Sequence, residues 1–336
     1  MKLAFTLKNS TQLKKVVMIT SRLFYRSTRK SLYIFHKRSR FSEELFKSNR
    51  IKLPSYILKG CEDIPLVPEI HGAREICQLR SIGKRVRMLL DSVALFIKPG
   101  TSTAEIDRFV LEYCLKHSLY PSPLGYKGFP STVCTSVNEV AIHGLPSKNA
   151  FLRADDLISV DVSLYDGQVH GDSCVTFLVS GESGLPSAHR DRNDLLLCAQ
   201  KCCQAGVSVC GPGVPYRFIA EAVSQAALSC GGFRVVAGLN GHGIGTYFHG
   251  PPDICHSVHE ERPEDDGVMC LGHVFTIEPC VAAPSESSDE EAVEKYVALP
   301  VTQSDGWSVS SSDHALTAQF EEMVLITDDG YELLSR

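Results

Sequence analysis

The chain has 336 residues, of which 43 % are hydrophobic and 22 % are charged, and its formal net charge at pH 7 is −5. This length and balance are those of an ordinary globular protein with enough chain for a large core. Residues 1–42 carry eleven Lys or Arg and no Asp or Glu, so the remainder holds 23 basic against 39 acidic side chains. Such an acidic body gives no support for nucleic-acid binding.

The basic N-terminus is predicted to be an extension, residues 1–55, that precedes one domain spanning residues 56–336. Rich in Arg and hydroxyl residues, it is typical of a mitochondrial transit peptide. The alternative is a disordered basic arm that contacts ribosomes or RNA. Its longest apolar run, VVMI at 16–19, is too short to cross a membrane. We therefore expect no membrane span and a location in the mitochondrial matrix, with the cytoplasm as the alternative.

The thirteen cysteines are scattered and form no CxxC pair. This pattern favours neither a zinc ribbon nor a disulfide framework, so we expect reduced thiols.

A first pair of helices is predicted after a Pro-rich stretch. Apolar residues recur at spacings of three and four from about residue 73 to residue 96, and Lys98-Pro99-Gly100 ends the pattern. Ser102 followed by Glu105 is a capping-box signal for the second helix.

A second pair of helices repeats this plan. Residues 195–209 and 218–228 have helical patterns, and Gly211-Pro212-Gly213 separates them. The two Pro-Gly breaks lie 113 residues apart, and each stands between two helices and ahead of a strand-rich stretch. We interpret this as an internal duplication of a helix–helix–strands unit.

Helices grouped before strands predict an α+β fold and not alternating parallel α/β units. The acidic, Ser-rich loop at 284–295 is predicted to be a solvated excursion. Strands are expected at 132–142, 157–165, 172–179, 233–238, 273–282, 295–301 and 319–327.

Four short segments hold carboxylates and a histidine that together make an oxygen-rich set of candidate metal ligands. Hard or borderline divalent cations prefer such a set, and four carboxylates would be costly to bury without cations. The segments are SVDVSLYDGQVHGDS (159–173), NGHGIGTYFHGPP (240–252), FTIEP (275–279) and AQFEE (318–322). The combination indicates a two-metal hydrolase with the ligands Asp161, Asp172, His242, Glu278 and Glu321.

Each of these residues also has a simpler interpretation. Asp161 could cap a strand, but it can share a pocket with Asp172 if the YDGQVH turn makes a hairpin. A lone histidine is usually a satisfied surface or core residue, yet the glycines around His242 clear space for a ligand. Glu278 and Glu321 lie beside apolar runs, where a carboxylate is costly unless it binds a cation or is protonated.

In this order and spacing the segments resemble the type I methionine aminopeptidases, and the mitochondrial branch of that family most closely. The resemblance covers roughly residues 70–334 and implies the pita-bread fold, in which two related α+β halves enclose a dinuclear metal centre. The 36 residues from His242 to Glu278 leave no room for the insertion that marks the type II enzymes. The segments in register are YPSPLGYKGFPSTVCTSVNEVAIHGLP, DVSLYDGQVHGDS, GHGIGTYFHG, FTIEP and W…AQFE.

The resemblance also implies roles for the ligands and for two histidines. Asp161 would chelate one metal, and Asp172 and Glu321 would bridge both. His242 and Glu278 would complete the direct ligands of the second metal. The cofactor would be two divalent ions, Co, Mn, Fe or Zn, between which a water becomes a nucleophile. Glu278 would be the general base. His143 would contact the scissile nitrogen, and His249 would stabilise the oxyanion.

A methionine pocket is implied as well. An apolar aromatic slot with a sulfur at its edge suits an unbranched thioether, although the same aromatics could be plain core. The matching residues are Tyr126, Phe129, Cys134, Phe248 and Trp307, with His143 and His249 beside them.

The chain departs from the family's pattern at four places. Glu322 follows the last ligand where His is usual, which would add negative charge beside the centre. Asp155 replaces a usual Gly, Lys127 stands where His is usual, and the 284–295 loop is longer than usual. None of these removes a ligand.

The resemblance thus implies removal of the initiator methionine from nascent proteins with a small second residue, by an enzyme that is monomeric and works near the ribosome. Two alternatives remain open. One is an Xaa-Pro aminopeptidase or prolidase, which shares the fold and ligands. The other is a non-catalytic pita-bread binding protein, although such relatives lose ligands.

Overall fold

The computed structural model describes residues 43–180, 186–260, 266–285 and 297–336, without side chains for residues 186–190. Residues 1–42 of the predicted transit peptide fall outside these ranges, as does most of the predicted solvated loop. Both stay predictions.

The first helix pair forms where the sequence predicts it. Helix α4 spans Ala73–Ala94 and buries one apolar face, and α5 spans Thr103–Lys116. The carboxylate of Glu105 accepts hydrogen bonds from the amide and the hydroxyl of Ser102, both at 2.8 Å. This contact satisfies an amide that has no partner within the helix, so the predicted start of α5 is confirmed.

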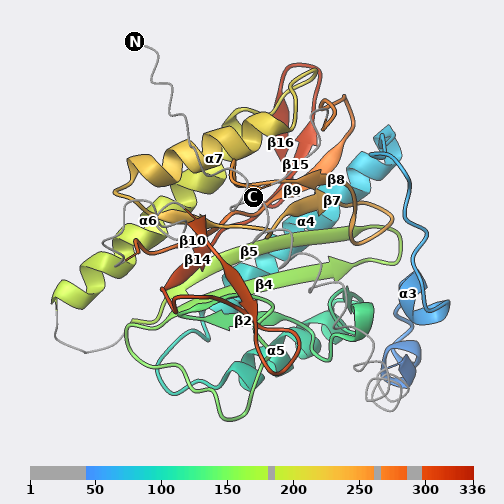
Figure 1. Ribbon diagram of the computed structural model, residues 1–336. Coiled ribbons are helices and arrows are strands. Elements are labelled where there is room, and N and C mark those ends of the chain that lie inside the picture. Colours follow the sequence, from blue (N-terminus) through green and yellow to red (C-terminus); the bar gives the residue numbers. More distant parts are fainter. Residues whose placement is uncertain (1–42, 181–185, 261–265, 286–296) are drawn as a thin grey trace.

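The second pair, α6 (Pro186–Ser208) and α7 (Arg217–Ser229), is longer than the sequence pattern indicated. Helix α6 begins nine residues earlier than expected, because Pro186 is well suited to a first helical turn. Each helix pair precedes a set of strands, as the duplication hypothesis requires (Figure 1).

Within the described residues the strands assemble into four small sheets, and most expected strands are present, although several are split in two. In order along the sheets these are β1-β4-β2 with β5 beside β4, β11-β6-β10-β14, β12-β13-β3 and β16-β15-β9-β7-β8. Their bounds are β1 Tyr120–Pro121, β2 Cys134–Val137, β3 Val140–Ile142, β4 Leu157–Tyr165, β5 His170–Leu178, β6 Arg234–Val236, β7 Gly241–Gly243, β8 Gly250–Ile254, β9 Val274–Ile277, β10 Cys280–Ala282, β11 Val297–Ala298, β12 Pro300–Thr302, β13 Val309–Ser311, β14 Thr317–Gln319, β15 Glu322–Ile326 and β16 Tyr331–Leu333.

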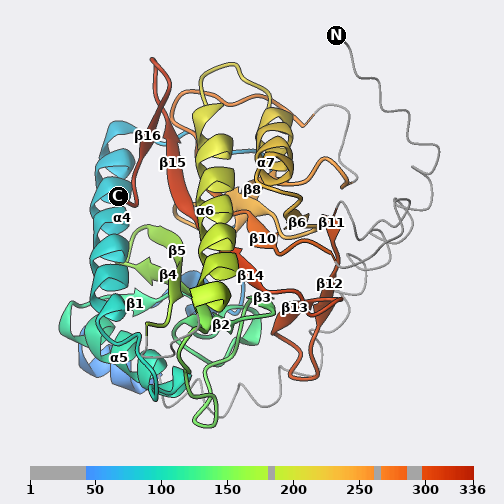
Figure 2. The same cartoon turned by 90° about the vertical axis from the view of Figure 1, so that its left-hand side faces the viewer.

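The helices form an outer layer against the strands. Figure 2 shows α4 and α6 both running upright, with β15, β4 and β5 visible between them and α7 beyond α6. Two large apolar clusters follow from the arrangement, one under α4 and α5 and the other under α6 and α7. The α+β expectation is confirmed.

The two halves meet where β5 runs beside the chain between β14 and β15. The Ser173 hydroxyl donates to the Glu321 carbonyl at 2.7 Å, and the Glu321 amide donates to the Cys174 carbonyl at 2.9 Å. An isolated bridge joins Val175 to Phe320. These contacts bring the second half's last acidic segment against the first half's hairpin.

A segment ahead of α4, here called the strap (residues 43–72), crosses both halves. It holds a helix at residues 43–48 and the short helix α3 (Ser55–Leu58), and it runs up one side of the molecule to α4 (Figure 1). The side chains of Phe46, Ile51 and Leu53 are buried in the first apolar cluster. The part of the predicted extension from residue 43 onward is therefore folded onto the domain.

Two further expectations concern the whole chain. None of the thirteen cysteines forms a disulfide, which agrees with reduced thiols. Among the described residues, no helix is both long and apolar enough to span a membrane.

Candidate metal centre

The β4–β5 hairpin presents the two aspartates on one face. Its antiparallel register pairs Asp161 with Cys174 and Asp172 with Ser163. The aspartates are therefore diagonal neighbours on the same side of the sheet, because side chains alternate along each strand. The Ser163 hydroxyl donates to Asp172 Oδ1 at 2.8 Å, which fixes that carboxylate. The hairpin expected from the turn sequence is confirmed.

The second half contributes His242 from β7 and Glu278 from just after β9. Thr276, which is fully buried, links them. Its hydroxyl accepts the His242 amide at 2.9 Å and donates to Glu278 Oε1 at 2.7 Å. The backbone of one candidate ligand and the carboxylate of the other are thus held by a single side chain.

The candidate ligands converge. Donor atoms of Asp172, His242 and Glu321 all lie within 4.8 Å of one another. His242 Nε2 is 3.8 Å from Asp172 Oδ2 and 3.6 Å from Glu278 Oε1. Asp161 faces the same cluster from the neighbouring strand, where it affects the titration of Asp172 and Glu278.

Burial and mutual repulsion make it energetically unfavourable for these carboxyl groups to be ionised without a bound cation. Burial raises the pKa of Asp161 to about 6 and that of Glu278 to about 8. Burial and the neighbouring carboxylates raise the pKa values of Asp172 and Glu321 well above their usual range. Burial also lowers the pKa of His242 to about 4, which leaves its imidazole neutral and able to coordinate a cation.

The donor set fits divalent cations. One buried oxygen of Asp161 has no hydrogen-bond partner within the described ranges, and neighbouring carboxylates in a dry setting need positive charge between them. Carboxylate oxygens with one imidazole suit Mn, Fe, Co or Zn.

Two histidines assigned to catalysis border this cluster. His249 lies against His242, with ring centroids 3.9 Å apart, and burial lowers its pKa well below the usual value. Burial lowers the pKa of His143 to about 4. His143 has a φ of 55°, a left-handed conformation that is rare for a residue other than Gly and that clusters at functional sites.

The residues expected to line the methionine pocket lie in three places. In two of them aromatic rings pack against one another, and in the third a cysteine lies beside the candidate metal ligands. Tyr126 stacks on His249 at 4.9 Å and meets Phe248 edge to face at 4.9 Å. Phe129 meets Trp307 edge to face at 5.2 Å. Cys134 pairs with Asp161 in the β2–β4 register and is buried.

Three polar residues that hold Glu278 have no clear signal in the sequence. Besides Thr276, the Gln319 amide donates to the carbonyl of Glu278 at 3.1 Å and to its Oε2 at 3.3 Å. His256 Nε2 accepts the Glu278 amide at 3.2 Å, while its Nδ1 lies 3.0 Å from the Leu239 carbonyl. A polar residue two positions before Glu278 on a strand, as Thr276 is, could have been suspected from the period of two. The partners of Gln319 and His256 are set by the tertiary fold.

The expectation that Glu322 adds charge to the centre is wrong. Its Oε2 accepts the Ser335 hydroxyl at 2.6 Å, and its Oε1 accepts Arg336 Nε at 2.7 Å. Because successive side chains on a strand point to opposite faces, Glu322 turns away when Glu321 turns inward.

Asp155, which stands where the family usually has glycine, adopts a backbone conformation that glycine favours. Its φ is 71°, so this turn adopts the conformation that glycine accommodates most readily.

Two helix-and-strand halves closed around buried carboxylates and a neutral histidine define a metal-dependent hydrolase. Residues 77–328 match the metallopeptidase family M24. The chain is 38 % identical over 268 residues to the mitochondrial methionine aminopeptidase 1D of Danio rerio, covering 80 % of this chain and 70 % of that protein. It is 35 % identical over 296 residues to the Homo sapiens protein of the same name, covering 85 % and 78 %. The chain therefore belongs to the M24 metallopeptidases and, among them, to the methionine aminopeptidases.

Solved structures agree with the predicted pita-bread fold. The methionine aminopeptidase of Rickettsia prowazekii superposes with a TM-score of 0.71 at 27 % identity, over 80 % of this chain and 100 % of that one. The Xaa-Pro dipeptidase of Bacillus anthracis superposes with a TM-score of 0.58 at 17 % identity, over 80 % of this chain and 62 % of that one. The second likeness is one of fold alone.

Proposed function

We propose that this protein removes the N-terminal methionine from nascent proteins whose second residue is small. The observation that carries the proposal is the convergence of Asp172, His242 and Glu321 within 4.8 Å, beside two buried histidines, in a chain of the methionine aminopeptidase family.

The candidate ligands Asp161, Asp172, His242, Glu278 and Glu321 would together hold the divalent ions. Cations held in this way supply the Lewis acidity that makes a water nucleophilic near neutral pH. Their identity among Co, Mn, Fe and Zn follows cellular supply.

The chain's own residues then divide the acid–base work. Glu278 takes the proton of the attacking water, and Thr276 and Gln319 hold its carboxylate in place. His249 donates to the scissile carbonyl oxygen as negative charge develops there. His143 contacts the scissile nitrogen and orients it to receive, as the amine leaves, the proton that Glu278 has taken. With its pKa lowered to about 4, the His143 ring is neutral at pH 7 and acts through its N–H group.

The methionine side chain would lie among Tyr126, Phe129, Cys134, Phe248 and Trp307. Phe129, Cys134 and Phe248 are buried apolar residues, and Tyr126 and Trp307 contact them or lie next to the catalytic histidines. A slot of this kind favours an unbranched thioether by burial of apolar area and by sulfur–aromatic contact.

Turnover of peptides tests the proposal. Metal-reconstituted full-length protein should release methionine from Met-Ala-Ser and leave Ala-Pro peptides almost uncut. The full chain is required, because removal of residues 1–55 would take Phe46, Ile51 and Leu53 out of the core. Preferred cleavage after the first residue of Ala-Pro would mean an Xaa-Pro peptidase, and no turnover with any of the four metals would mean a binding protein.

The cellular context of this activity is also a proposal. Nascent chains would reach a monomeric enzyme close to the ribosome in the mitochondrial matrix. The basic composition of residues 1–42 and the mitochondrial relatives support this location. A fluorescent protein fused to residues 1–42 should enter mitochondria, and diffuse cytosolic signal would contradict import by this segment.

A further inference from the structure

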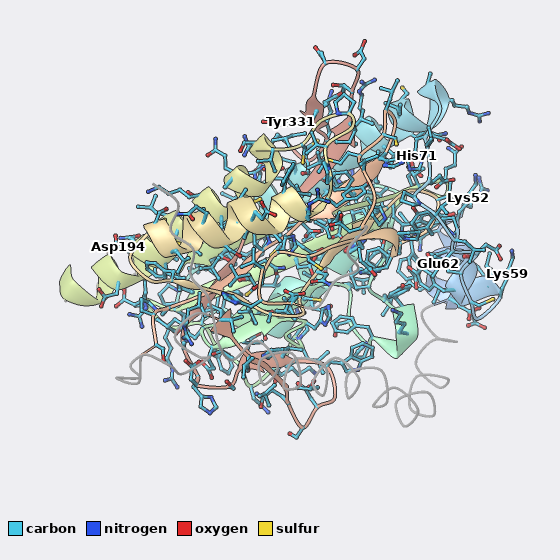
Figure 3. The ribbon with its side chains drawn as sticks, turned by 45° about the horizontal axis from the view of Figure 1, so that its top comes forward. Lys52, Lys59, Glu62, His71, Asp194 and Tyr331 are labelled. Carbon is cyan, nitrogen blue, oxygen red and sulfur yellow. The ribbon has the colours of Figure 1, made fainter. Side chains whose placement is uncertain are left out.

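The strap fastens the two halves of the molecule together from outside the matched family domain. In the first half, the Tyr56 hydroxyl donates to the Ser122 carbonyl at 2.6 Å. In the second half, the His71 amide donates to the Gly272 carbonyl at 3.0 Å. Figure 3 shows His71 and Glu62 on the same side of the molecule, where the strap runs.

Between these anchors, Glu62 leaves the strap and enters the protein. Its side chain is only 4 % exposed, and Oε1 accepts the Phe248 amide at 2.7 Å. The next residue, Asp63, is 81 % exposed and pairs with Lys59 on the surface at 2.9 Å. Of these two adjacent carboxylates, Glu62 is buried and Asp63 is exposed to solvent. A buried carboxylate needs specific partners to offset its lost hydration.

The partners of Glu62 come from both halves. Burial raises its pKa to about 7, while the Phe248 amide, the Lys127 charge and the nearby Tyr126 hydroxyl act in the opposite direction. Tyr126 precedes β2 in the first half, and Phe248 lies between β7 and β8 in the second. Both belong to the wall proposed for the methionine side chain, and Tyr126 stacks on His249.

We propose that Glu62 is a positioning residue of the methionine pocket, because it accepts the Phe248 amide of the second half and lies against the first half, with Oε1 3.9 Å from His170 Nε2 and its carboxyl facing the Tyr126 hydroxyl, and so fixes where the two sides of the pocket stand. This inference rests on the proposed function, which assigns that pocket to methionine. Without Glu62, the Phe248 amide is left buried without its acceptor, and the wall is free to shift. The metal ligands keep their own supports in Thr276, Gln319 and Ser163.

Steady-state kinetics of full-length, Mn-loaded variants test the inference. Glu62→Ala should raise KM for Met-Ala-Ser about tenfold, the scale of losing a hydrogen bond to a charged group, with kcat changed less than about threefold. The preference for Met-Ala-Ser over Leu-Ala-Ser should shrink. Glu62→Gln keeps an acceptor oxygen for Phe248 and should recover most of the loss. Asp63→Ala is the matched control and should behave like the unaltered protein.

Calorimetric titration with free L-methionine gives a second measurement that does not need turnover. Methionine should bind Glu62→Ala about tenfold more weakly, while Mn²⁺ binds as it does to the unaltered protein. An unaltered KM and methionine affinity in Glu62→Ala would overturn the inference, as would a matching loss in Asp63→Ala. If Glu62→Ala does not fold, Tyr126→Phe decides, since a KM like that of the unaltered enzyme would show that the link has no effect. Absence of turnover in the unaltered protein would count against the proposed function alone.

Discussion

Two consecutive glutamates, Glu321 just before β15 and Glu322 at its first position, have opposite environments. Glu321 faces the cluster of candidate metal ligands, where burial and three neighbouring carboxylates raise its pKa. Glu322 faces the C-terminal end of the chain and is paired with Ser335 and Arg336. The two side chains are adjacent in the chain, and they differ in the side to which each points.

The candidate metal centre also differs from another buried charged site in whether the charge has a partner of opposite sign. Arg234 is buried, but its guanidinium contacts the Ala283 carbonyl at 2.7 Å and Asp313 at 2.8 Å. Burial raises the pKa of Asp313, yet the Arg234 charge and hydrogen bond outweigh it and hold that pKa below its usual value. The buried charge of Arg234 thus has a partner of opposite sign, whereas the central carboxylates face one another. The centre is built to bind cations at a cost in stability.

Removal of a central ligand should have the largest effect. Asp172→Asn should lower kcat/KM for Met-Ala-Ser by about 10³-fold or more, because several kcal/mol of charge stabilisation depend on the bound ions. In chelator, the same variant should be more stable than the unaltered protein, since one of the repelling carboxyl groups is gone. Peptide turnover, Mn²⁺ calorimetry and urea unfolding measure these three properties. A variant that loses activity and also stability in chelator would contradict the comparison.

Removal of a catalytic group beside the centre should have a smaller effect. His143→Ala should retain Mn²⁺ but lower kcat by about 10²-fold, the scale typical of losing an acid–base group. The ligands do not depend on it, so calorimetry should give an unaltered metal affinity. His117→Ala, at the exposed C-terminal end of α5, serves as the control. An unaltered kcat in His143→Ala would remove this residue from the mechanism.

Much of the metal centre could be predicted because its candidate ligands stand in sequence contexts that ordinary core residues do not have. Carboxylates beside apolar runs, as at Glu278, and a histidine among glycines, as His242 is, conflict with plain core packing. The face of Glu322 was also predictable, since strand alternation sends it away from Glu321.

Other parts could not be predicted, because they depend on distant partners. Strand β7 has only Gly241, His242 and Gly243, which have little strand propensity, and it exists through its pairing with β8 and β9. Glu62 lies 186 positions from Phe248, in a Pro-rich stretch without periodicity. Contacts between residues so far apart in the sequence depend on how the two halves of the molecule pack together. No local sequence pattern predicts them.

The pH dependence of stability should separate metal-free from metal-loaded protein. Glu278, with a pKa of about 8 when folded and about 4.3 when unfolded, keeps a proton in the folded state that the unfolded state has released. Stability should therefore fall as the pH rises from about 6.5 to about 8, by up to about 1.4 kcal/mol per pH unit for each such carboxyl. Below about pH 6.5 the lowered pKa of His242 acts in the opposite direction, so the higher window isolates the carboxyls.

Urea unfolding in chelator and in Mn²⁺ measures this dependence. With Mn²⁺ bound, the central carboxylates are ionised in the folded protein as well, so the decline between about pH 6.5 and about pH 8 should shrink to the part below about pH 7 that Glu62 contributes. Equal slopes in chelator and in metal would mean that the central carboxyls do not carry the effect.

The smallest effect is expected at Glu322. Glu322→Gln keeps an acceptor for Ser335 and loses the charge that pairs with Arg336, whose side chain is 60 % exposed. Since exposed ion pairs contribute about 1 kcal/mol at most, the urea midpoint should shift only slightly, and kcat/KM should change less than about twofold. Glu321→Gln, one position earlier, should lose metal binding and activity. A tenfold change in the rate of Glu322→Gln would mean that its charge does reach the centre, and the two faces of β15 would then not be electrically separate.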